Sequence, residues 1–197
     1  MPPEPTILAF DTSAAHCAAA LLCGGNAPFT CVERMDRGQA ERLVPMLEEL
    51  LAQGGVGWRD LDAIGVGVGP GNFTGIRIAV ATARGLALGL GIPAVGVTGF
   101  DAADAPSGAV VLIDAPRGQA YVRRAGTDEE PRLVGAGDAA TLSDAVRLAD
   151  VPLPRMVTTI ARLAAARAHD PGPRPAPLYL RPADAAPASD PPPVILP

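Results

Sequence analysis

The chain has 197 residues, enough for one large domain or two small lobes, and its 48% hydrophobic residues can bury a sizeable core. Its formal net charge of −5 does not favour direct binding to nucleic acid, which needs a basic surface. No apolar run reaches the length of a membrane span, and the opening residues lack the basic segment of a signal peptide. Cys17, Cys23 and Cys31 contain no CxxC pair, so we expect reduced thiols in a cytoplasmic protein without membrane contact.

The first fifty residues predict a three-stranded antiparallel meander followed by a helix. Residues 7–10, 17–23 and 29–35 are apolar runs typical of strands, separated by turn signals, and the first of them ends at Asp11. Residues 39–53 predict an amphipathic helix, whose apolar side chains fall on one face: Leu43, Met46, Leu47, Leu50 and Leu51.

Residues 62–93 contain a buried strand, a glycine-rich turn and a long apolar helix, which together make half of a βαβ unit. Turns of this kind often hold phosphate on the N–H groups at the start of the helix. A P-loop would need a lysine after its last glycine, and the chain contains no lysine. A dinucleotide-binding motif fails at its third glycine, where Pro70 stands. Two hypotheses remain: the turn binds an anion, or Gly69 and Gly71 only allow a tight reversal of the chain.

Near residue 100 the pattern of the first strands begins again. Residues 110–113 form an apolar run that ends in Asp114, and a short turn leads to a return strand at 120–124, just as a return strand follows Asp11. This internal similarity predicts two lobes of similar construction.

The lobes differ in size, because few strands are predicted after residue 124. We expect a first lobe at 1–100 and a shortened second lobe at 101–170, with helices at 142–148 and 156–169. Residues 171–197 form a proline-rich tail, of which 178–180 should dock and 184–197 should be mobile.

Five segments carry a resemblance to a known family: ILAFDTS, RGQAERLVPML, GPGNFTGIRIAVATARGLALGLGIPAVGV, IDAPRGQAYV and PLYLRP. In this order they resemble the TsaB (YeaZ) family over nearly the whole chain. The resemblance implies an α/β protein of two lobes, similar to actin and hexokinase, each lobe with a ribonuclease-H-like mixed sheet. It also implies a non-catalytic subunit that supports TsaD in forming threonylcarbamoyladenosine in tRNA, with TsaE as the ATPase.

The same resemblance implies a homodimer when the chain is alone, and contact with tRNA only through the complex. Two other classes stay open: an ATP-binding, kinase-like enzyme of the actin/hexokinase superfamily, and a peptidase, as older glycoprotease labels suggest. A kinase needs phosphate and adenosine loops in the second lobe, which hardly has room for them. For a peptidase, no nucleophile–base pair and no zinc-protease motif is visible in the sequence.

The resemblance places the superfamily's first phosphate loop at Asp11, and the glycine-rich turn is a second candidate from its own residues; we expect both to be degenerate. The candidate cofactor-binding residues are Asp11, Thr12, Ser13, Gly69, Gly71 and Thr74. We expect no catalytic residue, no tightly bound cofactor, and at most weak binding of ATP or ADP.

The histidine and aspartate residues give little further support for a metal site or a catalytic site. TsaD-type enzymes hold a metal through His-x-x-x-His on the first helix, and the matching residues 39–43 contain no histidine, so we expect no metal site. A strand-end cap is favoured for Asp11 over a role in orienting a cation or water, because the sequence shows no titrating partner for it. His16 and His169 are expected to be incidental.

The helix after the glycine-rich turn carries small residues at four-residue spacing on two faces: Gly75, Ala79, Ala83, Ala87 on one, and Ala81, Gly85, Gly89 on the other. Small side chains let another helix approach closely. One face must meet the chain's own sheet, and the other can meet the first helix or a partner. The resemblance implies pairing through two first-lobe helices in a four-helix bundle, which gives these candidate interface residues: Leu43, Met46, Leu47, Leu50, Ile78, Thr82, Ala83 and Leu86.

The sequence suggests possible contacts for two arginines that lie near the turns. Arg77 either binds an anion or partner carboxylate, or braces the glycine-rich turn. Asp114 and Arg117 are placed to pair across their turn as a solvated surface pair.

Overall fold

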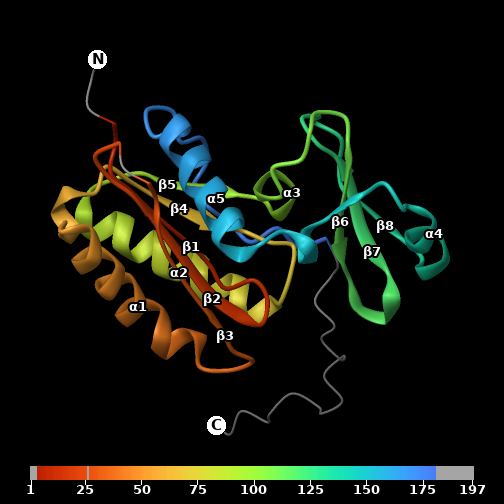
Figure 1. Ribbon diagram of the computed structural model, residues 1–197, viewed down its shortest axis with the longest axis horizontal. Helices are drawn as coiled ribbons and strands as arrows, with labels where there is room; N and C mark the ends of the chain where they lie inside the picture. The colour runs from red at the N-terminus through yellow and green to blue at the C-terminus, as the bar shows by residue number, and fades with distance from the viewer. Residues whose placement is uncertain (1–3, 26, 181–197) are drawn as a thin grey trace, which may run out of the picture.

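The computed structural model describes residues 4–25 and 27–180 and contains two mixed β-sheets. They lie side by side as two lobes, and the larger lobe carries most of the helices (Figure 1). The expected mobility of residues 184–197 concerns positions outside the described residues.

The first sheet begins with the predicted meander. Strands β1 (Ile7–Asp11), β2 (His16–Leu22) and β3 (Phe29–Arg34) pair antiparallel, and β4 (Ala63–Gly67) and β5 (Ala94–Val97) add parallel to β1, giving the order β3-β2-β1-β4-β5. All five residues of both β1 and β4 are buried, as expected for central strands covered on two faces.

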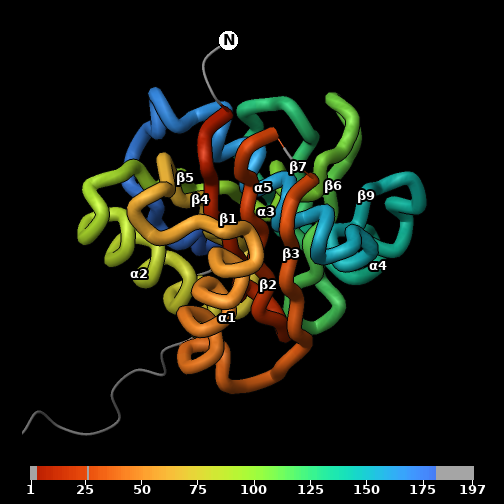
Figure 2. The backbone as a smooth tube through the Cα atoms, turned by 60° about the vertical axis from the view of Figure 1, so that its left-hand side comes forward, coloured from red at the N-terminus to blue at the C-terminus, as the bar shows by residue number. Residues whose placement is uncertain are grey.

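Helices cover both faces of this sheet (Figures 1 and 2). On one face, α1 (Gln39–Gly54) and α2 (Phe73–Leu90) pack with Leu8 and Phe10, and on the other face α5 (Leu153–Arg167) packs with Ile7 and Ala9. The alternation of β1 side chains between two apolar cores follows from the two-residue period of a strand. The first lobe therefore has a core on each side of its sheet.

The position of α5 corrects the expected domain boundary. Its chain position, after the second lobe's strands, gave this helix to residues 101–170, but its buried side chains, including Met156, Ile160 and Ala164, pack against the first sheet. The boundary is wrong for residues 153–167, because helical periodicity shows that a helix has an apolar face but not which sheet that face covers.

The second sheet repeats the arrangement of the first with fewer residues. Strands β6 (Val110–Asp114), β7 (Ala120–Arg124) and β8 (Arg132–Val134) form an antiparallel meander, and the short β9 (Val146–Arg147) pairs parallel with β6. The order β8-β7-β6-β9 corresponds to β3-β2-β1-β4, so the predicted duplication is confirmed at the level of topology.

The helix expected at 142–148 is wrong. The helix in this region is α4 (Ala136–Thr141), and Val146 instead pairs with Val111 at the sheet edge. The pairing of a β-branched residue with a buried strand overrides the local helical pattern.

Short elements complete the chain: 3-10 turns η1 (Trp58–Asp60), η2 (Pro116–Gly118) and η3 (Leu148–Asp150), and helix α3 (Gly99–Ala102), which leads from the first lobe to the second. By length and composition alone, α2 is apolar enough to cross a membrane, so the expectation that no run reaches that length is corrected. In this fold one face of the helix is buried against the first sheet, with six buried residues: Gly75, Ile76, Ala79, Val80, Ala83 and Ala87.

Candidate functional site

A cleft of about 1180 Å³ lies between the two lobes. Its first-lobe wall is formed by the β1–β2 turn and the glycine-rich turn, and includes Ser13, His16 and Asn72. The opposite wall is mostly apolar and comes from β6, η3, the start of α5 and the C-terminal segment, with Ile113 and Leu148 among its residues. Both candidate phosphate loops therefore meet at one edge of this cleft.

Asp11 is the centre of a buried polar cluster on the first-lobe wall. Its Oδ1 accepts hydrogen bonds from the Ser13 backbone N–H (2.9 Å), the Ser13 hydroxyl (2.8 Å) and His16 Nε2 (2.8 Å). Asp11 and His16 are only 3% and 6% exposed, so these bonds replace water for a buried carboxylate. An ionised carboxylate accepts only, which puts the imidazole proton on Nε2. His16 is thus the partner that sequence reasoning missed, and its expected incidental role is wrong.

The cluster contains the residue types of a serine hydrolase but not their arrangement. In a catalytic triad, the imidazole lies between the serine and the aspartate and takes the hydroxyl proton. Here both Ser13 Oγ and His16 Nε2 donate to the same oxygen of Asp11, so the serine hydroxyl is held by the carboxylate. The geometry supports positioning of the β1–β2 turn rather than activation of a nucleophile.

The glycine-rich turn interlocks with this β1–β2 turn. The Asn72 N–H donates to the Ser13 carbonyl (2.6 Å), and the Thr12 hydroxyl donates to the Gly75 carbonyl (2.7 Å). A Cβ on Gly71 would lie 2.3 Å from the Ser13 carbonyl oxygen, and one on Gly75 would lie 1.9 Å from that of Thr12. These contacts show why glycine is needed at both positions: two backbones approach too closely for any side chain.

Some backbone N–H groups at the N-terminus of α2 also have hydrogen-bond acceptors within the chain. The Asn72 side chain caps the helix by accepting from the Gly75 N–H at 2.9 Å. Because the N–H groups of Asn72 and Gly75 already have internal acceptors, the anion-binding hypothesis for the turn loses two of its donors, and the tight-turn hypothesis gains direct support.

The six candidate cofactor-binding residues separate into three groups. Ser13 and Gly71 line the cleft, and Thr74 is exposed on the first turn of α2 outside the lining. Asp11 and Thr12 are buried and committed to internal hydrogen bonds, and Gly69 is buried at a φ of 88° before the cis Gly69–Pro70 bond. Asp11 Oδ1 and the Thr12 hydroxyl make internal hydrogen bonds, as expected for a degenerate loop, and a phosphate role for these residues and for Gly69 stays a prediction.

The residues at the family's metal position do not fit a metal. Gln39 replaces the first histidine of the motif, and its side-chain amide donates to the Met35 carbonyl at 3.1 Å. Within residues 4–25 and 27–180, no three His, Cys, Asp or Glu side chains gather as a metal site would require.

Five of the eight candidate interface residues are fully buried in the chain's own core: Leu43, Met46, Leu47, Leu50 and Ala83. Direct partner contact through them is therefore wrong, because α1 and α2 use these side chains against the first sheet. Ile78, Thr82 and Leu86 are half-buried and remain at the surface edge of α2.

The exposed face of α2 carries the other small residues. Ala81, Gly85 and Gly89 are exposed, a Cβ on either glycine would meet nothing within 4 Å, and Leu88 beside them is 82% exposed. Small side chains on this face would allow another helix to approach closely. The spacing of Leu88, three and seven residues from Gly85 and Ala81, was a signal in the sequence that the interface prediction left out.

The arginine predictions have mixed outcomes. Arg77 Nε donates to the Tyr179 hydroxyl at 2.7 Å, and its guanidinium lies 3.7 Å from the centre of the Phe73 ring, so it braces the region of the turn. The expected pair of Asp114 with Arg117 is wrong, because Asp114 pairs with Arg147 from the neighbouring strand β9. Arg117 instead occupies the turn at a φ of 62°.

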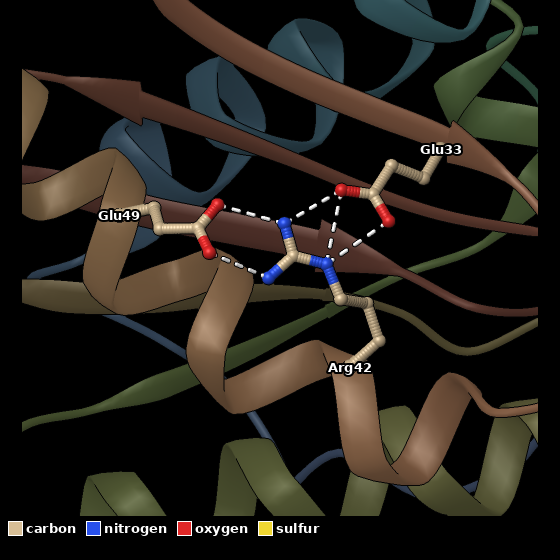
Figure 3. A network of polar contacts seen from close by, with 3 residues as sticks. All are labelled: Glu33, Arg42 and Glu49. Carbon is tan, nitrogen blue, oxygen red and sulfur yellow. Dashed lines mark hydrogen bonds and ion pairs between the residues drawn. The ribbon is translucent and has the colours of Figure 1, made fainter.

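A further network ties β3 to α1 (Figure 3). Arg42 donates to Glu33 at 2.6–2.9 Å and to Glu49 at 2.7 Å. The hydrogen bonds from Arg42 lower the pKa of both carboxyl groups below the usual glutamate range. Cys17 lies in the core beneath this network, and burial raises the pKa of its thiol to about 11, which keeps it protonated and unreactive at neutral pH.

Two mixed sheets of matching strand order, with a cleft between them, define an actin/hexokinase-like two-lobed protein. Residues 24–177 match the family model described as TsaD, tRNA N6-adenosine threonylcarbamoyltransferase, and the chain belongs to this family. It is similar to YeaZ from Pseudomonas aeruginosa, at 29% identity over 89% of this chain and 100% of that one, with a TM-score of 0.66.

A second solved structure, described as a protein with similarity to peptidase YeaZ from Pseudomonas aeruginosa, is 30% identical over 90% of this chain and 100% of its own, with a TM-score of 0.68. Comparison with curated proteins gives no match. The fold and the resemblance to the TsaB (YeaZ) family expected from the sequence are confirmed.

Proposed function

We propose that this chain is a non-catalytic, cytoplasmic subunit that supports TsaD in forming threonylcarbamoyladenosine in tRNA, with TsaE supplying the ATPase and the chain pairing with itself when alone. The observation that carries the proposal is the exposed face of α2, formed by Ala81, Gly85, Leu88 and Gly89. Family membership supports a role in the TsaD tRNA-modification system, and the exposed face of α2 supports a role through contact with a partner protein.

The absence of a catalytic role is argued from how the polar groups of the first lobe are used. The oxygen of Asp11 that holds Ser13 and His16 already has three donors, and Thr12 is bonded to Gly75. A catalytic carboxylate must be free to take a proton or hold a cation, whereas three donors on one oxygen tie this carboxylate to the β1–β2 turn. The cleft edge is therefore a fixed structural joint in this proposal.

Partner contact through α2 follows from the size of its exposed residues. A second helix can approach near the short end of the usual range of about 8–10 Å where glycine and alanine face it. Leu88 would then enter a groove of the partner helix and lose its water contact, which is the kind of apolar anchor that carries binding energy. The resemblance implies a four-helix bundle, and this face of α2 is the part of the chain that would enter it.

The test is a pull-down and a titration with the cognate TsaD, comparing the wild-type chain with Leu88→Asp. A carboxylate buried at the interface should weaken TsaD binding by at least roughly 100-fold while the thermal melt stays unchanged, because Leu88 is solvent-exposed in the free chain. Leu133→Asp is the matched control, since Leu133 is also exposed, at 41%, but lies on β8 of the second lobe. Normal TsaD binding by Leu88→Asp, or weak binding by both variants, would contradict the proposed face.

Nucleotide and RNA binding test the rest of the proposal. We expect the isolated chain to bind ATP or ADP no better than high-micromolar, about 5–6 kcal/mol, and not to shift tRNA at physiological salt. Low-micromolar binding in calorimetry would instead favour the kinase-like class. A salt-sensitive, submicromolar tRNA complex of the chain alone would contradict indirect RNA contact.

A further inference from the structure

The described end of the chain, Pro175–Leu180, crosses from the first lobe to the second between the two sheets (Figure 1). Pro175 is buried beside Gly96 of β5, where its Cα would lie 3.5 Å from a Cβ on that glycine. The Leu178 N–H donates to the Val68 carbonyl at 2.8 Å, just beyond β4. This segment is therefore anchored to the first sheet through its backbone before it reaches the second lobe.

Leu178 is packed against the cores of both lobes. It contacts the core between the first sheet and α1–α2, and also the second-lobe core around Phe100 and Tyr121. On the opposite face of the first sheet, Leu148 and Val151 make the equivalent bridge between the α5 core and the second-lobe core. The lobes are thus joined by apolar contacts on two sides, and the C-terminal segment forms the side next to α2.

The tip of this segment is held by an exposed stack on the first turn of α2. Arg77 Nε donates to the Tyr179 hydroxyl at 2.7 Å, the guanidinium lies over the Phe73 ring, and the Phe73 and Tyr179 ring centres are 5.1 Å apart. Phe73 and Tyr179 are 40% and 44% exposed, in contrast to the buried Pro175. Exposed cation–π and aromatic contacts are weak enough to break and reform, whereas the buried anchor is not.

We propose that residues 175–180 act as a strap that sets the angle between the lobes, with the Arg77–Phe73–Tyr179 stack as its releasable end. Releasing Tyr179 frees Leu178 and Leu180 from the second-lobe core, and the cleft widens on the α2 side while Leu148 and Val151 hold the other side. Phe73 and Tyr179 also line the cleft. The strap therefore connects the width of the cleft to the first turn of α2, and it does so in the isolated chain, whatever partner α2 binds.

The first measurement is hydrogen exchange at the Leu178 amide in the full-length chain. Arg77→Ala and Tyr179→Ala should each speed this exchange by roughly 5- to 10-fold, and Tyr179→Phe, which keeps the ring and loses the hydroxyl, should have a smaller effect. Arg84→Ala is the matched control, because Arg84 is an exposed arginine on the same helix, two turns away from the stack. All three positions are on the surface, so the four variants should melt as the wild type does.

The second measurement separates lobe movement from local fraying. Spin labels at Ala40→Cys on α1 and Ala140→Cys on α4, in a Cys23→Ala/Cys31→Ala background, report the distance between the lobes. The proposal expects a longer or broader distance distribution in Arg77→Ala and Tyr179→Ala and no change in Arg84→Ala. Unchanged Leu178 exchange would show that the stack does not hold the strap. Faster exchange with an unchanged interlobe distance would show that the strap does not set the angle, and either result overturns the proposal.

Discussion

The hairpins that open the two lobes have the same topology but different surroundings. Asp11 ends β1 and is buried with His16, whereas Asp114 ends β6 and is exposed with Arg147. The first sheet has helices on both faces, α1 and α2 on one and α5 on the other, while the only helix of the second lobe beyond the linking α3 is the six-residue α4 among the described residues. Asp11 is buried where the β1–β2 turn interlocks with the glycine-rich turn, so what packs against the hairpin, rather than the hairpin itself, decides whether a strand-end aspartate is buried.

The largest expected effect on stability comes from placing a charge on the buried face of α2. Ala83→Glu would place a carboxylate in a core where the native side chain is fully buried, costing at least about 3 kcal/mol and unfolding much of the chain. Ala81→Glu, on the exposed face of the same helix, should leave the melting temperature nearly unchanged. A thermal melt of both variants measures the difference, and a folded, stable Ala83→Glu chain would mean that α2 does not pack on the sheet in solution.

The next largest effect on stability comes from removing the strand-end aspartates, Asp11 and Asp114. Asp11→Ala would leave the Ser13 N–H, the Ser13 hydroxyl and His16 Nε2 without their acceptor in a buried site, and should lower the free energy of unfolding by about 3 kcal/mol. Asp114→Ala removes a half-exposed ion pair and should cost less than about 1 kcal/mol. Urea unfolding of the two variants measures this ratio. Equal losses would show that burial does not distinguish the hairpins.

A smaller effect compares the inner and outer glycines of α2. Gly85→Ala meets no neighbouring atom and should stabilise the free chain by about 0.5–1 kcal/mol through higher helix propensity. Gly75→Ala would bring a Cβ within 1.9 Å of the Thr12 carbonyl oxygen and should destabilise instead. If a TsaD helix packs closely on the outer face, Gly85→Ala should also weaken that complex. Calorimetric melts with and without TsaD separate the two effects.

The smallest effect lies at the exposed edge where β3 meets α1. Arg42 lowers the pKa of Glu33 and Glu49, so its stabilising contribution is fully present above the ordinary glutamate pKa of about 4.3 and is lost as the pH falls through the lowered values in the folded state. The melting temperatures of wild type and Arg42→Met should therefore differ most near pH 6–7 and converge toward pH 3. A gap that widens on acidification would contradict the assigned direction of the pKa shifts.

Within the fold, sequence patterns were reliable where one segment carried the whole signal. The meander, the glycine-rich turn between β4 and α2, and the second start at Asp114 were all predicted, because strand alternation, turn residues and strand ends are local properties. The motif resemblance extended this to the two-lobed class, which the family match and the YeaZ structures confirm. The helix predicted at 142–148 failed, since pairing of Val146 with Val111 is not a local property.

The tertiary structure alone decided which partner each face and each polar group found. The apolar face of α5 was visible in sequence, but only packing assigned it to the first sheet, and only packing put Ala83 inside and Leu88 outside on one helix. His16 holds Asp11 because β1 and β2 pair in a register that brings two residues five apart onto the same side of a turn. Arg147 replaces Arg117 as the partner of Asp114 because β9 pairs beside β6. Periodicity in one chain defines a face, and the energy of burying that face against a distant segment decides what it meets.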